Sequence, residues 1–277
     1  MCVFSASNRQ FPDPAVMKAD SIRLLFQTPV TARVRGFAAI LKRLANRALP
    51  SQCALCGNMS QELLCNGCDA QYWNEPRSRC ATCALPLAAS WLRREREDVR
   101  VHCSACLESP PAYNDTLALA DYRAPLDTLA VGLKFRARLA TGAEFARHLH
   151  RTFEDSGLSA PDVIVPVPLS GARLVARGYN QAWAIARPLA QRMGVRSDAS
   201  LVARVRHTSA QSRLDQDTRR RNVASAFVVS GDVRGRHVGV VDDVMTSGAT
   251  LDAVARTLKL SGARRVTNFV ALRTPKD

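Results

Sequence analysis

One short stretch of this sequence joins an apolar run to two adjacent acids. Val240 and Val241 end the apolar run, and Asp242 and Asp243 follow them directly. Carboxylates at the end of a buried strand can accept hydrogen bonds from sugar hydroxyls or help to hold Mg²⁺. The carboxyl ends of strands are also where open α/β sheets bind their ligands. The pair therefore predicts a site for a hydroxylated ligand.

The residues after the two acids are suited to a phosphate group. They are Thr246, Ser247, Gly248, Ala249 and Thr250. Their hydroxyls and the free backbone N–H groups of a following helix are donors, and the helix dipole favours an anion. A simple acidic helix cap, with Ser247 or Thr246 as N-cap, would explain one acid and one hydroxyl but not the whole string. Neither a GxxxxGKS/T P-loop nor a GxGxxG loop occurs in the chain.

Eight of the nine cysteines form four CxxC pairs. The pairs are Cys53 and Cys56, Cys65 and Cys68, Cys80 and Cys83, and Cys103 and Cys106. Each pair forms a tight turn that aims two sulfurs at one point, and two pairs supply the four thiolates of a tetrahedral zinc site. A redox CxxC would occur once, near the start of a helix. The sequence therefore predicts two structural Zn²⁺ ions.

The pairing of these ligands is left open by the sequence. Chain order assigns the first four cysteines to one ion and the last four to the other, but interleaved pairing is an alternative. His102 could replace a ligand, although a surface histidine is the simpler interpretation, and Cys2 is expected to be a free thiol. Closed four-thiolate sites do no chemistry, so we expect a scaffold or a contact surface for a partner or nucleic acid.

Alternating strands and helices are predicted to position the two acids. We expect strands at 117–120, 162–167, 238–241 and 266–272, and helices at 126–135, 142–153, 180–193 and 250–260. This alternation favours a parallel sheet that is covered on both faces. Pro188 lies inside the third helix and predicts a kink or an irregular turn.

Composition divides the chain into three segments. Residues 1–50 are a basic N-terminal extension in which 30–49 form a predicted amphipathic helix. This helix packs on the following domain or, as a weaker alternative, binds a membrane interface or nucleic acid. Residues 51–108 hold the cysteine pairs, and after a proline-containing joint residues 113–277 form the α/β domain.

The charge balance predicts anionic partners. Among 277 residues, 39 Lys and Arg stand against 24 acids, for a net charge of +15. Nucleic acid, phosphorylated ligands or an anionic membrane face would suit this excess. Arginine outnumbers lysine, so a solubilising surface in an arginine-rich proteome explains the excess equally well. No secretory leader and no apolar run of about 18 residues is found, which predicts a cytoplasmic protein without a transmembrane segment.

The stretch at 240–250 resembles the signature with which type I phosphoribosyltransferases bind 5-phosphoribosyl-1-pyrophosphate (PRPP). More narrowly, residues 53–273 resemble the ComF/GntX family, which joins a double zinc ribbon to that fold. Further matching strings are Pro166 to Leu169, Arg173, Arg177 to Ala182, Gln211, Leu214, Arg221 to Val223, Ala226 and Phe227. The resemblance implies an α/β type I phosphoribosyltransferase fold, a parallel sheet with flanking helices, preceded by a small double zinc-ribbon module.

The resemblance also implies roles for the residues that bind the sugar. Asp242 and Asp243 would contact the ribose hydroxyls, and Thr246 to Thr250 would hold the 5-phosphate. Ser247 stands where the family often has threonine, and it keeps the hydroxyl.

The family pattern assigns the pyrophosphate to a second loop. Pro168 and Leu169 would lie in that loop, and Arg173 and Arg177 are candidates for pyrophosphate contact, because guanidinium forks suit phosphate oxygens. Residues 207–222 would form a mobile arm over the site.

Two functions are compatible with this resemblance. The first is phosphoribosyl transfer from PRPP with Mg²⁺, to an acceptor that nothing in the sequence identifies. The second is a non-enzymatic competence factor that binds single-stranded DNA and other DNA-uptake proteins and keeps the fold as a ligand-binding scaffold. It would be cytoplasmic, or peripheral at the inner membrane face. Tyr72 and Trp73 could stack on bases, although core packing is the simpler interpretation of Trp73.

Overall fold

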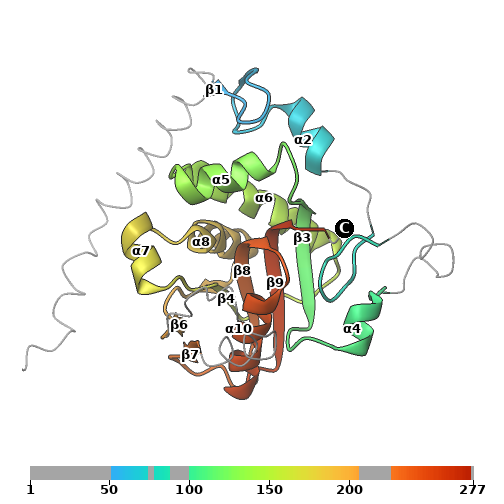
Figure 1. The fold of residues 1–277 in the computed structure, drawn as a ribbon, viewed down its shortest axis with the longest axis vertical. Coiled ribbons are helices and arrows are strands. Elements are labelled where there is room, and N and C mark those ends of the chain that lie inside the picture. The colour runs from blue at the N-terminus through green and yellow to red at the C-terminus, as the bar shows by residue number, and fades with distance from the viewer. Residues whose placement is uncertain (1–50, 74–77, 88–99, 206–225, 276–277) are drawn as a thin grey trace, which may run out of the picture. The chain divides into compact units, whose positions relative to one another are not determined.

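The computed structural model describes residues 51–73, 78–87, 100–205 and 226–275 (Figure 1). Contacts along the chain define two compact units, Met1–Pro50 and Ser51–Asp277. The predicted helix at 30–49 and the predicted arm at 207–222 lie outside the described residues. The cysteine pairs and the α/β fold thus belong to the same unit.

A five-stranded parallel sheet forms the centre of the second unit. Its strand order is β3 (Asp115–Asp121), β9 (Arg265–Arg273), β8 (His237–Met245), β4 (Val163–Pro166) and β5 (Arg196–Ser197). All neighbours in this order pair in parallel, with Val165 opposite Val240 and Val241 opposite Phe269. The predicted parallel sheet is confirmed, and its carboxyl edge carries the ends of β4, β8 and β9.

Helices cover both faces of this sheet (Figure 1). They are α5 (Asp127–Phe135), α6 (Leu139–Asp155), α8 (Gln181–Met193) and α10 (Ala249–Leu260). Helix α7 (Gly171–Arg177) follows β4 and has no buried residue. Val241 and Phe269 pack in one core with α5, α6 and α8, whereas Val240 and Val270 pack in a second core with α10. Adjacent residues of a strand point to opposite faces, so continuous apolar runs are needed to fill both cores.

Two of the helices on the first face, α6 and α8, lie unusually close together. A Cβ atom on Gly142 of α6 would lie 2.6 Å from the carbonyl oxygen of Ala184 in α8. Any larger side chain at this position would push the helices apart. Helix α8 continues without interruption through Pro188, so the expected irregular turn is not found there. Burial of one face of α8 against the sheet offsets the hydrogen bond that proline cannot donate.

The extent predicted for one strand was wrong. Strand β8 does not end at Val241 but continues to Met245, so both acids lie inside the strand. Pairing with β9 continues through Asp242 opposite Val270 and Met245 opposite Arg273. Ladder hydrogen bonds join backbone groups, and they persist where the side chains become polar.

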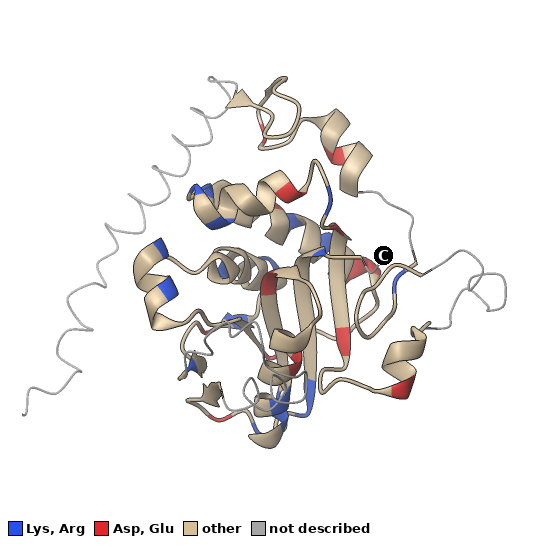
Figure 2. Ribbon diagram, viewed as in Figure 1, with Lys and Arg blue, Asp and Glu red and all other residues tan. Residues whose placement is uncertain are grey.

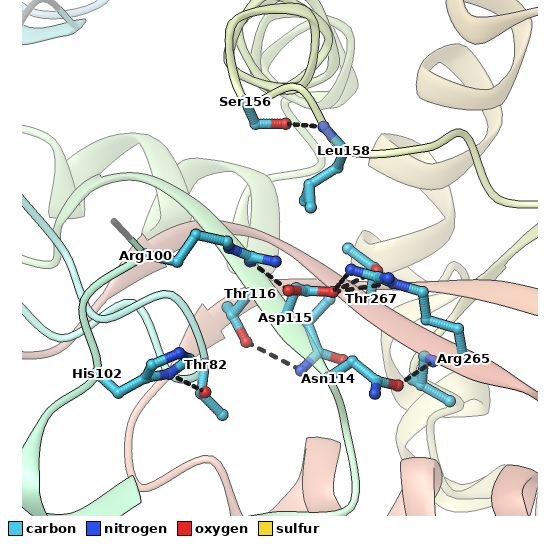
Figure 3. A network of polar contacts seen from close by, with 12 residues as sticks. Thr82, Arg100, His102, Asn114, Asp115, Thr116, Ser156, Leu158, Arg265 and Thr267 are labelled. Carbon is cyan, nitrogen blue, oxygen red and sulfur yellow. Dashed lines mark hydrogen bonds and ion pairs between the residues drawn. The ribbon is translucent and has the colours of Figure 1, made fainter. Parts of the chain in front are cut away.

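The cysteine pairs lie in short elements around this fold. These are β1 (Ser51–Gln52), β2 (Met59–Ser60), α2 (Asn66–Trp73) and α4 (Ser104–Glu108), together with the turns next to them. A separate two-stranded antiparallel sheet pairs β6 (Val202–Arg204) with β7 (Phe227–Val229). Figure 3 shows how the segment before Cys103 reaches the sheet: Arg100 and Arg265 both donate to the buried Asp115. The Arg265–Asp115 contact is 2.6 Å. This network holds the cysteine-containing segment against the amino end of β3.

Candidate functional site

The acidic pair lies at the carboxyl end of β8, and its two side chains differ in their surroundings. Asp243 is buried, whereas Asp242 is partly exposed. Strand alternation directs them to opposite faces of the sheet. Asp242 Oδ1 also accepts a hydrogen bond from the backbone N–H of Asp243 at 2.9 Å. Two adjacent carboxylates therefore differ in their exposure to solvent.

Asp243 has two partners from distant parts of the chain. Lys134, near the end of α5, lies 3.0 Å from Asp243 Oδ2. Gln181, at the start of α8, donates from Nε2 to Asp243 Oδ1 at 3.4 Å. A buried carboxylate requires such pairing, because the charge would otherwise be strongly disfavoured. Neither Lys134 nor Gln181 carries a predicted role, because a lone lysine or glutamine at a helix end gives no distinguishing signal in the sequence.

Among the described residues, no cation forms an ion pair with Asp242 as Lys134 does with Asp243. Burial, followed by the neighbouring Asp243 carboxylate, raises the pKa of Asp242 well above its usual value. The charged form of this side chain is thus disfavoured in the folded protein. A magnesium ion or a ring of sugar hydroxyls would reverse that balance, because both favour the ionised carboxylate.

Asp242→Asn is expected to stabilise the fold at neutral pH. Because the folded-state pKa of this carboxyl is raised, its ionisation opposes folding at high pH, and the penalty decreases as the pH falls from the folded-state pKa towards the unfolded-state value. The melting temperature of the variant should therefore exceed that of the parent at about pH 8, and the difference should shrink towards about pH 5. Calorimetric melts across this range check both points. A variant that melts below the parent at both pH values would contradict the predicted sign.

The β8–α10 segment, Thr246–Thr250, turns from the strand into the helix. Gly248 has φ +81° and is the N-cap of α10, which therefore begins at Ala249. Thr246 and Ser247 are exposed, and Ser247 Oγ accepts from the N–H of Ala249 at 3.3 Å. The first turn of a helix leaves N–H groups without intrahelical partners. The two acids lie in the strand and outside this cap, so the simple helix-cap interpretation is wrong.

A second loop lies beside this segment at the same edge of the sheet. It follows β4, whose last residue Pro166 pairs with Val241, and contains Pro168 and Leu169. Ser170 then caps α7 by accepting from the N–H of Arg173 at 3.4 Å. The fold thus brings the predicted pyrophosphate loop next to the predicted sugar-binding strand, although they are far apart in sequence.

The two candidate arginines lie on α7 and have different neighbours. Arg173 is exposed. Arg177 donates to Gln181 Oε1, and its guanidinium carbon lies 5.4 Å from the ring centroid of Phe135. Since Gln181 also reaches Asp243, contacts lead from the exposed Phe135 to the buried acid of β8. Arg177 is thereby held close to the acidic pair, whereas Arg173 lies nearer the start of the same helix.

The structure groups the cysteines in chain order. The first cysteine cluster is Cys53, Cys56, Cys65 and Cys68, and the second cysteine cluster is Cys80, Cys83, Cys103 and Cys106. Within each cluster all four sulfurs lie within 4.8 Å of one another. This geometry excludes the interleaved alternative. His102 is not part of either cluster, because its Nδ1 atom hydrogen-bonds to Thr82 Oγ1 at 2.8 Å (Figure 3).

Backbone donors in both clusters favour thiolates, the form that binds metal. The N–H of Cys65 donates to Cys53 Sγ at 3.3 Å, and the N–H of Cys103 donates to Cys80 Sγ at 3.2 Å. Burial raises the pKa of Cys53, but N–H donors of its own cluster lower it overall to about 6. A hydrogen bond from the Cys83 thiol, followed by backbone donors, lowers the pKa of Cys80 to about 4. Burial raises the pKa of Cys68 and of Cys106 to about 12, so deprotonation of all four sulfurs of a cluster requires a bound cation such as Zn²⁺.

Purified protein is expected to contain about two zinc ions per chain, because eight thiolates bind at four per ion. Elemental analysis of protein that has been passed over a desalting column checks this number. Cys2 lies outside the four CxxC pairs of the sequence, so Cys2→Ser should leave the zinc content unchanged. A folded protein that contains no zinc would overturn the assignment.

A third group of possible ligands is better explained as a structural contact. Asp69 of α2 lies near Glu144 and His148 of α6, but Arg147 lies between them. Arg147 Nη2 is 2.7 Å from Asp69 and 2.5 Å from Glu144. Burial raises the pKa of Glu144, but hydrogen bonds from His148 and then from Arg147 lower it overall to about 2. Trp73 stacks on His148 at 4.7 Å, in accord with the core-packing interpretation. These contacts attach the first cysteine cluster to α6.

Comparison with known proteins agrees with this geometry. Residues 136–277 match the family described as phosphoribosyl transferase domain. The chain is 34% identical to the DNA utilization protein YhgH of Salmonella typhimurium over 82% of this chain and 98% of that protein. It is 30% identical to competence protein F of Haemophilus influenzae over 73% of this chain and 87% of that protein. The chain belongs to the ComF-like phosphoribosyltransferase family.

Other similarities of this ComF-like chain are more restricted. It is 37% identical to a ribose-phosphate pyrophosphokinase of Pasteurella multocida over 24% of this chain and 22% of that protein. Among solved structures, the glutamine PRPP amidotransferase from B. subtilis, complexed with ADP and GMP, matches with a TM-score of 0.36 and 16% identity. This match covers 51% of the ComF-like chain and 30% of the amidotransferase. No helix in the described part of the chain is long and apolar enough to cross a membrane.

Proposed function

We propose that this protein binds PRPP together with Mg²⁺ and transfers the phosphoribosyl group to a nitrogen base. The observation that carries this proposal is the arrangement at the carboxyl edge of the sheet. There the acids Asp242 and Asp243 lie directly before the β8–α10 segment, and the loop after β4 lies beside them. Each of these three parts suits a different part of PRPP.

The proposed roles follow from the donors and acceptors that each part offers. Asp242 and Asp243 accept hydrogen bonds from the ribose hydroxyls, and the β8–α10 segment donates to the 5-phosphate. The loop with Pro168 and Leu169 faces the pyrophosphate, which Arg173 and Arg177 approach from α7. In this arrangement Lys134, which is paired with Asp243, gives the site one more cation.

The reaction that fits these roles is a displacement at the anomeric carbon. A lone pair of the acceptor nitrogen forms the new bond to this carbon, and the bond to the pyrophosphate oxygen breaks. Mg²⁺, when bound, would neutralise charge on the departing pyrophosphate. The contribution of the protein is to position the ribose and to stabilise the pyrophosphate with cations, and the proton that the acceptor nitrogen loses passes to the departing pyrophosphate or to water.

Titration calorimetry tests binding, and release of pyrophosphate tests transfer. PRPP should bind in the presence of Mg²⁺, and a panel of purine and pyrimidine bases should identify one that causes PRPP turnover. Absence of PRPP binding with Mg²⁺ would overturn the proposal. Binding without turnover by any base would favour a scaffold that retains only the ligand.

A second candidate function is binding of single-stranded DNA, and one surface favours it. This basic–apolar surface consists of Phe135, Arg136, Arg138 and Leu139 around the α5–α6 turn and Arg173, Leu174, Val175 and Arg177 of α7. Figure 2 shows basic residues on α7 and at the end of α5. Phe135 is 70% exposed and Val175 is 85% exposed. Cations that follow a phosphate backbone, next to an aromatic ring on which a base can stack, are typical of single-strand binding.

Phe135→Ala is expected to weaken binding of a short single-stranded oligonucleotide. A base stacked on an aromatic ring contributes about 1–3 kcal/mol, so affinity should fall by about 5- to 150-fold. Fluorescence anisotropy at increasing salt measures the affinity, which should also decrease steeply with salt in the parent protein.

The control removes an exposed apolar side chain elsewhere. Leu260 is 84% exposed at the end of α10, which leads away from the carboxyl edge of the sheet. Leu260→Ala should bind the oligonucleotide as the parent does. A flat salt response in the parent, or equal losses in both variants, would exclude the basic–apolar surface as the DNA site.

A further inference from the structure

Arg273, the last residue of β9, is a buried arginine at the carboxyl edge of the sheet. It is 1% exposed. Its guanidinium donates to backbone carbonyl oxygens: Nε to Cys83 at 2.9 Å, and Nη1 to Met245 at 3.0 Å, to Thr274 at 2.8 Å and to Thr246. A buried charge requires full hydrogen bonding, so these carbonyl groups are held firmly.

Two of these carbonyls belong to the end of β8 and the start of the β8–α10 segment. The peptide bond is planar and trans here, so the C=O and the following N–H point in opposite directions. A Thr246 carbonyl held by Arg273 therefore directs the N–H of Ser247 away from the core. In the same way, the Met245 carbonyl directs the N–H of Thr246. Arg273 thus aims two backbone donors towards the solvent side, where both residues are exposed.

The carbonyl of Cys83, which accepts from Arg273 Nε, belongs to the second cysteine cluster. Cys80 and Cys83 are buried in the same apolar core as Met245 and Tyr113. The neighbouring segments are also joined, because the N–H of Ala112 donates to Asp252 of α10 at 2.7 Å. The second cysteine cluster therefore packs against the β8–α10 segment.

The first cysteine cluster is held differently. Its helix α2 is attached to α6 by the Asp69–Arg147 ion pair and by the packing of Trp73 on His148. Cys53 and Cys68 lie in the core on the opposite face of the sheet from Cys80 and Cys83. Arg273 therefore joins the second cluster to the β8–α10 segment, whereas the first cluster is attached to α6.

We propose that Arg273 is a positioning residue that links the second cysteine cluster to the β8–α10 segment. Metal in the second cluster restrains the Cys83 carbonyl, this carbonyl holds the guanidinium, and the guanidinium aims the N–H groups of Thr246 and Ser247 at the 5-phosphate. Occupancy of the second cluster, and not of the first, then controls affinity for the 5-phosphate. The proposal rests on the proposed PRPP site, of which it specifies the regulation.

Two ligands separate the parts of the site. Ribose 5-phosphate requires the β8–α10 segment, whereas Mg-pyrophosphate requires the loop after β4. We expect Arg273→Lys to retain both zinc ions and to lose about tenfold or more in affinity for ribose 5-phosphate, the loss of one charge-assisted hydrogen bond. Affinity for Mg-pyrophosphate should change less than about twofold. A general loss of structure would weaken both ligands equally.

Matched cysteine variants test the role of the metal. Cys106 and Cys65 are both partly buried, one in each cluster. Each serine variant should lose about one zinc ion, but only Cys106→Ser should lose affinity for ribose 5-phosphate. Should Cys106→Ser fail to fold, the fully metallated Arg273→Lys still carries the test.

The outcomes distinguish this inference from the proposed function. A parent protein that binds neither ligand contradicts the proposed function itself. A parent that binds both, with equal losses in Cys65→Ser and Cys106→Ser, or with full ribose 5-phosphate affinity in Arg273→Lys, overturns the inference alone.

Discussion

The double variant Asp242→Asn with Asp243→Asn is expected to lose measurable PRPP binding while it remains folded. Each carboxylate supplies a charge-assisted acceptor worth about 1.5–3 kcal/mol, so loss of both should reduce affinity by at least about 100-fold. Asparagine has nearly the same shape as aspartate. Removal of the disfavoured charge at Asp242 offsets part of the loss of the Asp243–Lys134 ion pair.

Titration calorimetry with PRPP and Mg²⁺ measures the effect, and a thermal melt measures folding. Asp155→Asn is the matched control, because Asp155 is exposed at the end of α6, remote from the carboxyl edge of the sheet. This control should bind PRPP as the parent does. Unchanged affinity in the double variant would show that the acids of β8 do not bind the sugar.

Gly248→Val is expected to have the second large effect, on both stability and binding. Gly248 has φ +81°, a conformation that costs a β-branched residue about 1–3 kcal/mol. A Cβ atom there would lie 2.6 Å from Met245 Cε and 3.1 Å from the hydroxyl of Tyr113. The methionine end can move only within a packed core, which adds about 1–3 kcal/mol. Together these effects predict a loss of about 2–6 kcal/mol.

Chemical denaturation measures this loss, and calorimetry should detect no PRPP binding because the turn can no longer present its donors. Gly171, at the start of α7, has open space around its missing Cβ, so Gly171→Ala is a control in the neighbouring loop. It should be nearly as stable as the parent. If Gly248→Val were equally stable, the left-handed conformation of this turn would be wrong.

Several features of the site could be predicted because they depend on local order in the sequence. Four CxxC pairs indicate a metal site, whatever their arrangement, and acids that follow an apolar run indicate the carboxyl-terminal part of a buried strand, although β8 continues past them. The parallel sheet also followed from the alternation of short apolar runs with helical periodicity. Even the turn at Gly248 has a local cause, since few other residues adopt its backbone angle.

Other features depended on where distant segments meet. Lys134 and Gln181 reach Asp243 only because α5 and α8 pack on the same face of the sheet, and neither residue type is unusual at a helix end. The extent of β8 was underestimated because pairing with β9 continues regardless of polar side chains. Arg177 contacts Gln181, which reaches Asp243, because Arg177 is the last residue of α7. Arg173 lies earlier on this helix and does not share these contacts.

The sequence by itself therefore determined the chemistry that is available: eight thiolates, a pair of carboxylates, a hydroxyl-rich turn and an excess of cations. Only the tertiary structure decided how these groups are combined. It grouped the cysteines in chain order, separated the two acids by their access to solvent, and joined the second cysteine cluster to the β8–α10 segment through Arg273. The physical reason is that sulfur proximity, burial and carbonyl orientation arise from packing between segments remote in sequence, which no local pattern records.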